Sequence, residues 1–187
     1  MSRELREEVL AGLSAAVEQL TRFMDPALIP EVGTNLAFAL PGARTNDDVA
    51  AVQGRVVLLE GRVHPVGQVA FGASDHVARV VLTAMKFDPA MRSAGNIRYS
   101  PPIIEILEGM LLEICSFDRE REPPGIRTMD WGVASCCRSG VPDVIFDRGA
   151  VGKEPMVRIL CENPSDVAAI IMKVSTRMRT TGSSVST

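Results

Sequence analysis

Four short polar segments carry the side chains best suited to chemistry, and each lies where a helix or strand is predicted to begin or end. They are "GTN", ending at Asn35; Arg55 in "GRVV"; "ASDHVAR", with Ser74, His76 and Arg79; and "DRGAVGKEP", residues 147 to 155. Small residues, cations and helix starts are what phosphate groups bind. The four segments therefore point to a phosphorylated ligand.

The segment "FGASDHVARVVLTAMKF", residues 71 to 87, predicts a helix that opens from a Gly-Ala-Ser turn. Its first backbone N–H groups and positive dipole end could hold an anion beside Ser74 and His76. Arg79 follows His76 at i+3 on the same helical face, and Lys86 lies two turns further on. A serine at this position is more often an ordinary helix cap, and a histidine in a first turn is more often a surface or structural residue. Both interpretations remain open.

The glycine-rich segment 147 to 155 places Gly149, Gly152 and Lys153 between two predicted strands. Its composition suits a nest of N–H donors with an ammonium beside it. It lacks the spacing and the Ser/Thr of a Walker A motif, and an ordinary hairpin loop has the same composition. The segment ending at Asn35 is likewise typical of a plain turn.

Metal and nucleophile candidates are few. Asp118 and Asp147 follow or end predicted strands and could ligate Mg²⁺, although strand-end carboxylates are common without a metal. Only two histidines are present, and the four cysteines form no C-x-x-C pair, which disfavours zinc; in a cytosolic protein we expect no disulfides either. The cysteines lie in predicted strands or helices with no sign of activation. The residues therefore predict binding of a phosphorylated small molecule without naming a reaction.

Length and composition restrict the class of protein. The 187 residues are 46% hydrophobic and 23% charged, so we expect one domain over residues 1 to 179 and a disordered tail over 180 to 187. A net charge of -3 and only 4% aromatic residues disfavour a nucleic-acid partner. No apolar run reaches the roughly 18 residues of a membrane span, and the first residues do not resemble a signal peptide. We therefore expect a cytoplasmic protein without a membrane partner.

Hydrophobic periodicity predicts helices alternating with strands. An amphipathic helix is expected over 3 to 24, a strand over 36 to 40, an antiparallel strand pair over 54 to 61 and 67 to 72, and a helix from 75. Further on we predict a strand over 96 to 99, a helix over 101 to 114 capped by Ser100, a strand over 114 to 117, a helix from Thr128 to 140, a strand pair over 142 to 147 and 156 to 161, and a helix over 164 to 179. This order predicts an α/β fold in which helices cover a mixed sheet.

Several ordered segments resemble one family. They are "IPEVGTNLAFALPGA", "DVAAVQGRVV", "FGASDHVARVVLTAMKFDPAMRSAGNIRYS", "SFDRE", "GVPDVIFDRGAVGKEPMVRIL" and "NPSDV". Together they are similar to the archaeal-type thiamine-phosphate synthase family, over about residues 25 to 175. That domain is usually fused behind a hydroxymethylpyrimidine phosphate kinase, and related chains place it behind a DNA-binding domain as a regulator.

The resemblance implies a three-layer α/β/α fold similar to class II aldolases (AraD-like), with a mixed, mostly antiparallel sheet. It also implies a transferase that joins hydroxymethylpyrimidine diphosphate to hydroxyethylthiazole phosphate, giving thiamine phosphate and pyrophosphate. The functional Arg and His of the family match Arg55 and His76. Both are retained here, whereas the regulators tend to lose them.

Roles for the other candidates follow as hypotheses. Arg55 would pair bidentately with a phosphate, and His76, titrating near neutral pH, would donate to the leaving pyrophosphate. Lys153 and the backbone of 149 to 152 would hold a second phosphate. Ser74 and Arg79 are further phosphate candidates, and Asn35, Lys86 and Asn96 are candidates for other substrate contacts.

The resemblance also implies partners and competing functions. We expect Mg²⁺ as a charge neutraliser, a separate pyrimidine kinase, and a homodimer in which the N-terminal helix is either a contact or a remnant of the connection to the kinase. One alternative function is a sensor that binds thiamine phosphate without turnover. Another is a sugar-phosphate aldolase, which is disfavoured because His64 and His76 are the only histidines.

Overall fold

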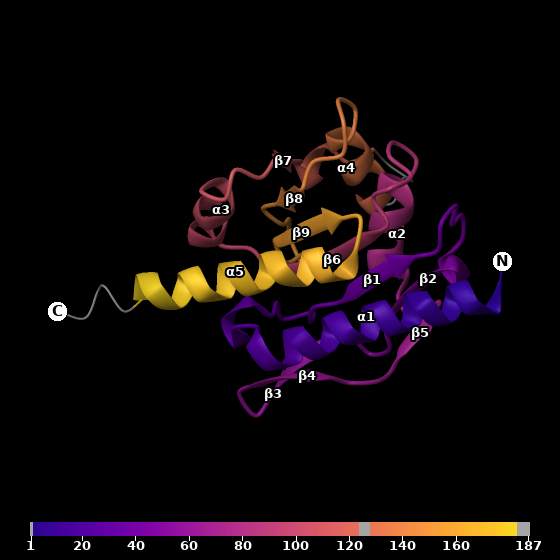
Figure 1. The fold of residues 1–187 in the computed structure, drawn as a ribbon. Helices are drawn as coiled ribbons and strands as arrows, with labels where there is room; N and C mark the ends of the chain where they lie inside the picture. The colour runs from indigo at the N-terminus through magenta and orange to yellow at the C-terminus, as the bar shows by residue number, and fades with distance from the viewer. Residues whose placement is uncertain (1, 124–127, 183–187) are drawn as a thin grey trace.

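The computed structural model describes residues 2–123 and 128–182, and a seven-stranded sheet lies at its centre (Figure 1). The strand order is β5-β2-β1-β6-β9-β8-β7. All neighbours are antiparallel except β7 and β8. The bounds are β1 Leu36–Ala39, β2 Val49–Val52, β5 Val69–Phe71, β6 Ser93–Arg98, β7 Ile114–Ser116, β8 Val144–Asp147 and β9 Met156–Cys161. The predicted mixed, mostly antiparallel sheet is confirmed.

Helices cover both faces of this sheet and complete three layers. One face carries α1 (Arg3–Phe23), α3 (Pro101–Glu108) and α5 (Pro164–Gly182), and the other carries α2 (Asp75–Ala84) and α4 (Thr128–Cys136). Successive β1 side chains alternate between the two layers, with Leu36 and Phe38 in one core and Ala37 and Ala39 in the other. The predicted α/β/α architecture is therefore confirmed.

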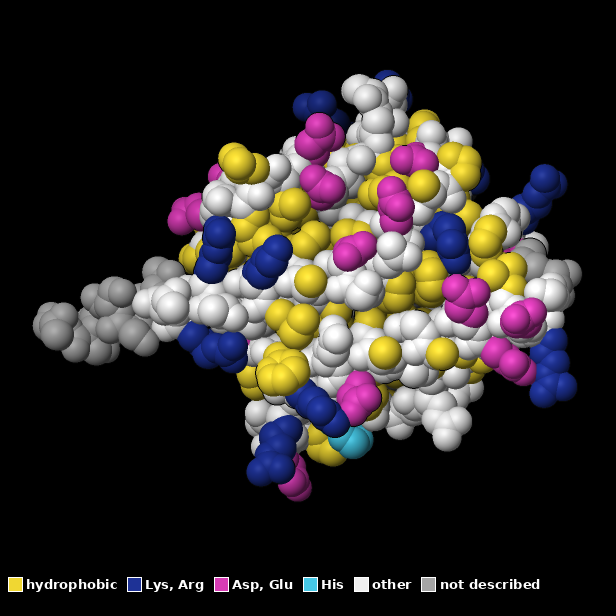
Figure 2. Space-filling view, in the orientation of Figure 1, with side chains coloured by type: hydrophobic (Ala, Val, Ile, Leu, Met, Phe, Trp, Pro, Cys, Tyr) yellow, Lys and Arg dark blue, Asp and Glu magenta, His cyan; other side chains and the backbone are white. Residues whose placement is uncertain are grey.

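The N-terminal helix is part of the domain core. The side chain of Ser2 caps α1, and the apolar residues Val9, Leu13, Val17 and Leu20 recur on one buried face. This face packs on the sheet, and α1 lies beside α5 (Figure 1). α1 therefore contributes to the hydrophobic core of the domain, because it buries much of its apolar surface here. The outer face of α1 and α5 intersperses acidic and basic side chains (Figure 2).

The strand pairing predicted for residues 54 to 72 is wrong. β3 (Val56–Leu59) pairs with β4 (Arg62–Pro65), a strand inside the segment that we expected to be a connector, whereas β5 pairs with β2. Glu60 and Gly61 both have positive φ, 49° and 77°, which is what a two-residue hairpin turn requires. β2 has the sequence "VAAV", whose alanines give little strand signal, and it was not predicted.

Several helix ends also differ from the prediction. α3 ends at Glu108 and α4 at Cys136, both earlier than expected. α5 continues to Gly182, so residues 180 to 182 belong to the helix and not to a tail. The remainder of the predicted tail, 183 to 187, lies outside the described residues. In the described part of the chain, no helix has both the length and the apolarity to cross a bilayer.

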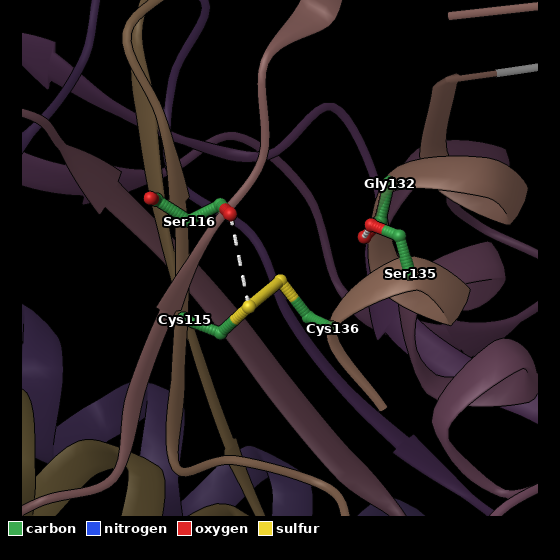
Figure 3. The surroundings of a disulfide bond; sticks show 5 residues. All are labelled: Cys115, Ser116, Gly132, Ser135 and Cys136. Carbon is green, nitrogen blue, oxygen red and sulfur yellow. Dashed lines mark hydrogen bonds between the residues drawn. A yellow bond between two sulfur atoms is a disulfide. The ribbon is translucent and has the colours of Figure 1, made fainter. Parts of the chain in front are cut away.

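Two cysteines form a disulfide, which contradicts the expectation that none is present. Cys115 of β7 bonds to Cys136 of α4, with their Cα atoms 5.8 Å apart (Figure 3). Residues 21 apart in the chain carry no pairing signal, and only the packing of α4 near the sheet edge brings them within bonding range. Burial raises the pKa of the two free thiols, to about 11 for Cys137 and about 12 for Cys161. Neither free thiol is an activated nucleophile.

Candidate active site

A cleft of about 210 Å³ brings together seven of the predicted site residues. It opens between the first turn of α2, the loop before β1 and the loop that joins β8 to β9. The predicted residues that line it are Asn35, Arg55, Ser74, His76, Asn96, Gly152 and Lys153. They come from segments as far apart as 118 residues in the chain (153 − 35), so the fold assembles the cleft.

Asn35 and Asn96 shape the floor of the cleft with hydrogen bonds inside the protein. The Oδ1 of Asn35 accepts from the Leu36 and Val52 N–H groups at 2.9 and 3.0 Å, and its Nδ2 donates to the Val52 carbonyl at 3.0 Å. The Oδ1 of Asn96 accepts from the Asn35 N–H at 2.8 Å, and its Nδ2 donates to the Gly33 carbonyl at 3.0 Å. These amides hold β1 and the preceding loop in place, so they position the site.

Arg55 has an unusual backbone conformation at the edge of the cleft. Its φ is 71°, in the left-handed region that disfavours residues with a Cβ, and it directly follows Gly54 at φ 69°. The guanidinium donates to the Val32 carbonyl across the cleft mouth. Residues with a Cβ and a positive φ are found at functional sites, where the surrounding structure maintains the strained backbone. The conformation directs a cationic side chain toward the ligand space.

The first turn of α2 forms the opposite wall. Ser74 is the N-cap residue, yet its hydroxyl makes no capping hydrogen bond, and Ser74, His76 and Val77 all line the cleft. The start of a helix offers backbone N–H donors and a partial positive charge. This geometry suits an anion-binding site, which was one of the two interpretations of this helix start from the sequence.

The surroundings of His76 lower the pKa of its imidazole below the near-neutral range that the sequence suggested. The side chain lines the cleft, and the residue as a whole is exposed to solvent. Partial burial, followed by the positive charges of Arg158, Arg55 and Arg119, lowers its pKa from 6.5 to about 4. The residue can donate one N–H hydrogen bond without carrying a charge.

The loop between β8 and β9 delivers Lys153. Gly149 has φ 76°, and a Cβ built there would lie 2.5 Å from the Lys153 carbonyl oxygen, so the tight turn requires glycine. Reciprocal backbone hydrogen bonds between Ala150 and Lys153, 3.1 and 2.8 Å long, close this turn. The Lys153 ammonium lies 3.4 Å from a carboxylate oxygen of Glu122. Glu154 accepts from the N–H groups of residues 31 and 32 at 2.9 and 3.2 Å, which ties this loop to the one before β1.

A buried ionic cluster supports the cleft from below. The Asp147 carboxylate, fully buried, accepts two hydrogen bonds from Arg119, at 2.6 and 3.1 Å, and one from Arg158 at 2.8 Å. Two guanidinium groups share one carboxylate, which leaves a net positive charge beside the cleft. Burial lowers the pKa of Arg158, and its Nε and Nη2 make no hydrogen bond among the described residues. An anion in the cleft would offset this charge.

The two carboxylates proposed for Mg²⁺ do not fit that role. Asp147 uses both oxygens for arginine and for the Gly149 N–H, 2.9 Å away. Asp118 caps the short helix η3 (Arg119–Arg121) through the Glu120 N–H and pairs with Arg121 at 3.6 Å. Within the described ranges, no group of three or more Asp, Glu, His or Cys side chains could hold a metal ion.

Three predicted phosphate or substrate residues lie outside the cleft. Arg79 pairs with Asp75 in the first turn of its own helix at 2.9 Å and with Asp130 of α4 at 3.1 Å. Lys86 lines a separate depression beside Arg79, and Gly149 lines another depression, which adjoins the cleft. Arg79 and His76 do share a turn of helix, but the two carboxylates draw the arginine away.

Two arginines were missed as site residues. Arg119 lines the cleft with its side chain 9% exposed, and Arg158 lies below it, 1% exposed. A signal for Arg158 was present, because a charged residue in the middle of the apolar strand "MVRILC" requires a buried partner. Nothing local to "SFDRE" distinguished Arg119 from an ordinary surface residue.

The fold is an α/β/α domain, and its cleft gathers arginine, lysine and a helix start, which are groups that suit a phosphorylated small molecule. The model of one family, described as thiamine-phosphate synthase ThiN, matches residues 12–173. The chain belongs to this family.

Curated relatives agree with this assignment. A bifunctional thiamine biosynthesis protein ThiDN from Methanocaldococcus jannaschii is 43% identical over 165 residues, which are 87% of this chain and 39% of that protein. The thiamine-phosphate synthase ThiN of Methanothermobacter thermautotrophicus is 38% identical over 79% of this chain and 81% of its own length. The chain therefore spans about two fifths of the bifunctional relative and most of the other.

Solved structures show the same fold. The crystal structure of a C-terminal domain of phosphomethylpyrimidine kinase is 40% identical, with a TM-score of 0.84, and covers 90% of this chain and 99% of that one. A sugar-phosphate aldolase from Thermotoga maritima is only 8% identical, with a TM-score of 0.55 over 97% of this chain and 98% of that one. The second likeness concerns the fold alone, and it agrees with the predicted class II aldolase architecture.

Proposed function

We propose that this chain is a thiamine-phosphate synthase that joins hydroxymethylpyrimidine diphosphate to hydroxyethylthiazole phosphate and releases pyrophosphate. Membership of the family supports this function. The observation in the structure that carries it is the cleft, where Arg55, Arg119 and Lys153 face the first turn of α2. Three cations and a helix start suit the several negative charges of a diphosphate.

The reaction needs positioning and charge stabilisation more than a protein nucleophile. The thiazole nitrogen forms a bond to the methylene carbon of the pyrimidine, the C–O bond to the diphosphate breaks, and its electron pair leaves with pyrophosphate. That nitrogen carries no proton, so the protein need not remove one. The cleft supplies what remains, which is alignment of the two substrates and donors for the developing pyrophosphate charge.

Arg55 and His76 would act directly on the leaving group. Arg55 would pair with a phosphate through its guanidinium, and the neutral His76 would donate an N–H hydrogen bond to a pyrophosphate oxygen. Lys153 and the adjoining backbone would hold the other phosphate. Asn35 and Asn96 would act indirectly, by holding the loop that contains Gly33.

Magnesium is proposed only as a companion of the diphosphate. Mg²⁺ supplies charge neutralisation to phosphate oxygens and commonly keeps most of its ligands from substrate and water. Because Asp118 and Asp147 are engaged elsewhere, we assign no protein ligand to it.

The same function suggests partners and a compartment. A pyrimidine kinase must supply the diphosphate, and the similarity to a C-terminal domain of phosphomethylpyrimidine kinase supports association with a separate kinase. We also propose a homodimer. The substrates carry phosphate charges that do not cross membranes unaided, so the cytoplasm is the compartment that fits.

Pyrophosphate should raise the pKa of His76 from about 4 toward its ordinary value. Burial is the largest cause of the lowered pKa, and the positive charges of Arg158, Arg55 and Arg119 add to it; an anion bound among these arginines opposes their effect. Binding then takes up a proton at any pH between the free and bound pKa values, so affinity should increase as the pH falls through that window. NMR titration of the imidazole with and without pyrophosphate measures the bound and the free pKa values of His76.

The other histidine provides the internal control for this titration. His64 lies on β4, outside the cleft, and its signals should not respond to pyrophosphate. A His64→Gln variant assigns the signals. If the His76 signals also ignore saturating pyrophosphate, the diphosphate does not bind beside it.

The decisive test of function mixes the purified chain with both substrates and Mg²⁺. We expect thiamine phosphate and pyrophosphate to accumulate in equal amounts, and His76→Ala, which removes the N–H donor, to slow this by on the order of 10². Absence of product together with tight binding of thiamine phosphate would instead establish the non-catalytic sensor.

A further inference from the structure

A second pocket, about 530 Å³ in volume, adjoins the cleft and shares Arg119 with it. It lies between β7, η3, α4 and the residues that follow β8. The side chains that matter here are Ser116, Arg119, Arg121, Trp131, Ser135 and Arg148. None of the residues predicted to be catalytic lies in it, so the cleft does not account for its chemistry.

The second pocket combines an aromatic surface with guanidinium groups. Trp131, the single tryptophan of the chain, meets the Phe117 ring edge to face, with centroids 6.1 Å apart and planes at 89°. Arg121 and Arg148 add two cations to Arg119, and among the described residues that line the pocket the one carboxylate, that of Asp118, pairs with Arg121 at 3.6 Å. A flat ring with a phosphate group is the ligand that such a surface recognises.

We propose that the second pocket binds the thiazole phosphate, with its ring near Trp131 and its phosphate at Arg121 and Arg148. This inference rests on the proposed synthase function. The cleft, with Arg55, Lys153 and the start of α2, suits the more highly charged diphosphate. The shared residue Arg119 marks the place where the two ligands meet, which is where the thiazole nitrogen must reach the methylene carbon.

The disulfide joins two walls of the second pocket. Ser116 follows Cys115 on β7, and Ser135 precedes Cys136 on α4, so the bonded cysteines adjoin two residues that line the pocket (Figure 3). Gly132 brings α4 against Phe117 so closely that a Cβ there would lie 2.5 Å from the ring. The covalent link and the close contact hold Trp131 at a fixed place relative to Arg119.

Trp131 fluorescence reports occupancy of this pocket without turnover. Titration with the thiazole phosphate alone should change the emission and saturate, whereas pyrophosphate alone should change it little. Arg148→Gln should weaken thiazole phosphate binding about tenfold or more, because a hydrogen bond to a charged group is lost. Pyrophosphate binding should stay within about twofold of the wild type. Arg62→Gln is the matched control, because it makes the same change on the exposed β3–β4 hairpin. It should alter neither thiazole phosphate binding nor pyrophosphate binding.

Turnover separates failure of this assignment from failure of the proposed function. In a competent synthase, Arg148→Gln should raise the KM for the thiazole phosphate and leave the KM for the pyrimidine diphosphate unchanged. Normal turnover with no fluorescence response and unaltered KM values would overturn the assignment and leave the synthase intact. A response to the pyrimidine diphosphate alone would overturn it as well. Saturable quenching by the thiazole phosphate without any product would support the pocket and reject the synthase.

Discussion

Replacement of Arg55 by glycine should abolish most synthase activity and leave the protein at least as stable as before. Arg55 has φ 71°, a conformation that costs a residue with a Cβ about 1 to 2 kcal/mol and costs glycine little. Glycine also gains freedom in the unfolded chain, so the net change in unfolding free energy should lie between zero and about +1 kcal/mol. The loss of a preorganised charge donor should lower kcat/KM by on the order of 10² or more.

Leu111 offers a matched control for the backbone effect. It also has positive φ, 59°, but its side chain is 95% exposed and lies outside the cleft. Leu111→Gly should therefore relieve similar strain without loss of activity. Denaturant unfolding and steady-state kinetics on both variants measure the two effects separately. A clear loss of stability in Arg55→Gly would mean that the arginine holds the loop through Val32, and that its main role is structural.

Local signals in the sequence predicted the parts of the site that depend on one segment. The Gly-Ala-Ser turn before His76 and the glycines before Lys153 each impose a backbone shape over a few residues. The resemblance then added Arg55, which has little local signal of its own. The layers and the mixed sheet followed from the order of strands and helices.

The rest depends on contacts between distant segments. Asn35 looks like an ordinary turn residue until β2 and Asn96 provide its hydrogen-bond partners. Arg119 enters the site only because Asp147, 28 residues away, fixes its guanidinium. The pairing of β5 with β2 was missed for the same reason, since alanine-rich β2 obtains its stability from burial on both faces.

The largest loss of stability is expected when Asp147 is replaced by asparagine. The fully buried carboxylate is shared by Arg119 and Arg158, and removal of its charge leaves Arg158 buried and uncompensated. Breaking a buried pair in this way costs about 3 to 5 kcal/mol of unfolding free energy. Activity should fall too, because Arg119 loses its anchor. Asp118→Asn, at a carboxylate whose side chain is 52% exposed, should cost less than about 1 kcal/mol.

A second substitution distinguishes this ionic cluster from a metal site. If Asp147 neutralises arginine, changing Arg158 to methionine in the Asp147→Asn background should recover part of the lost stability, because the uncompensated charge is removed. Wild-type unfolding in denaturant should be the same with Mg²⁺ and with EDTA. If Asp147 instead ligates Mg²⁺, EDTA should destabilise the wild type, and the second substitution should add to the damage. The two roles predict opposite changes in unfolding free energy when Arg158→Met is added to Asp147→Asn. One unfolding experiment therefore decides whether Asp147 acts by neutralising the arginines beside the cleft.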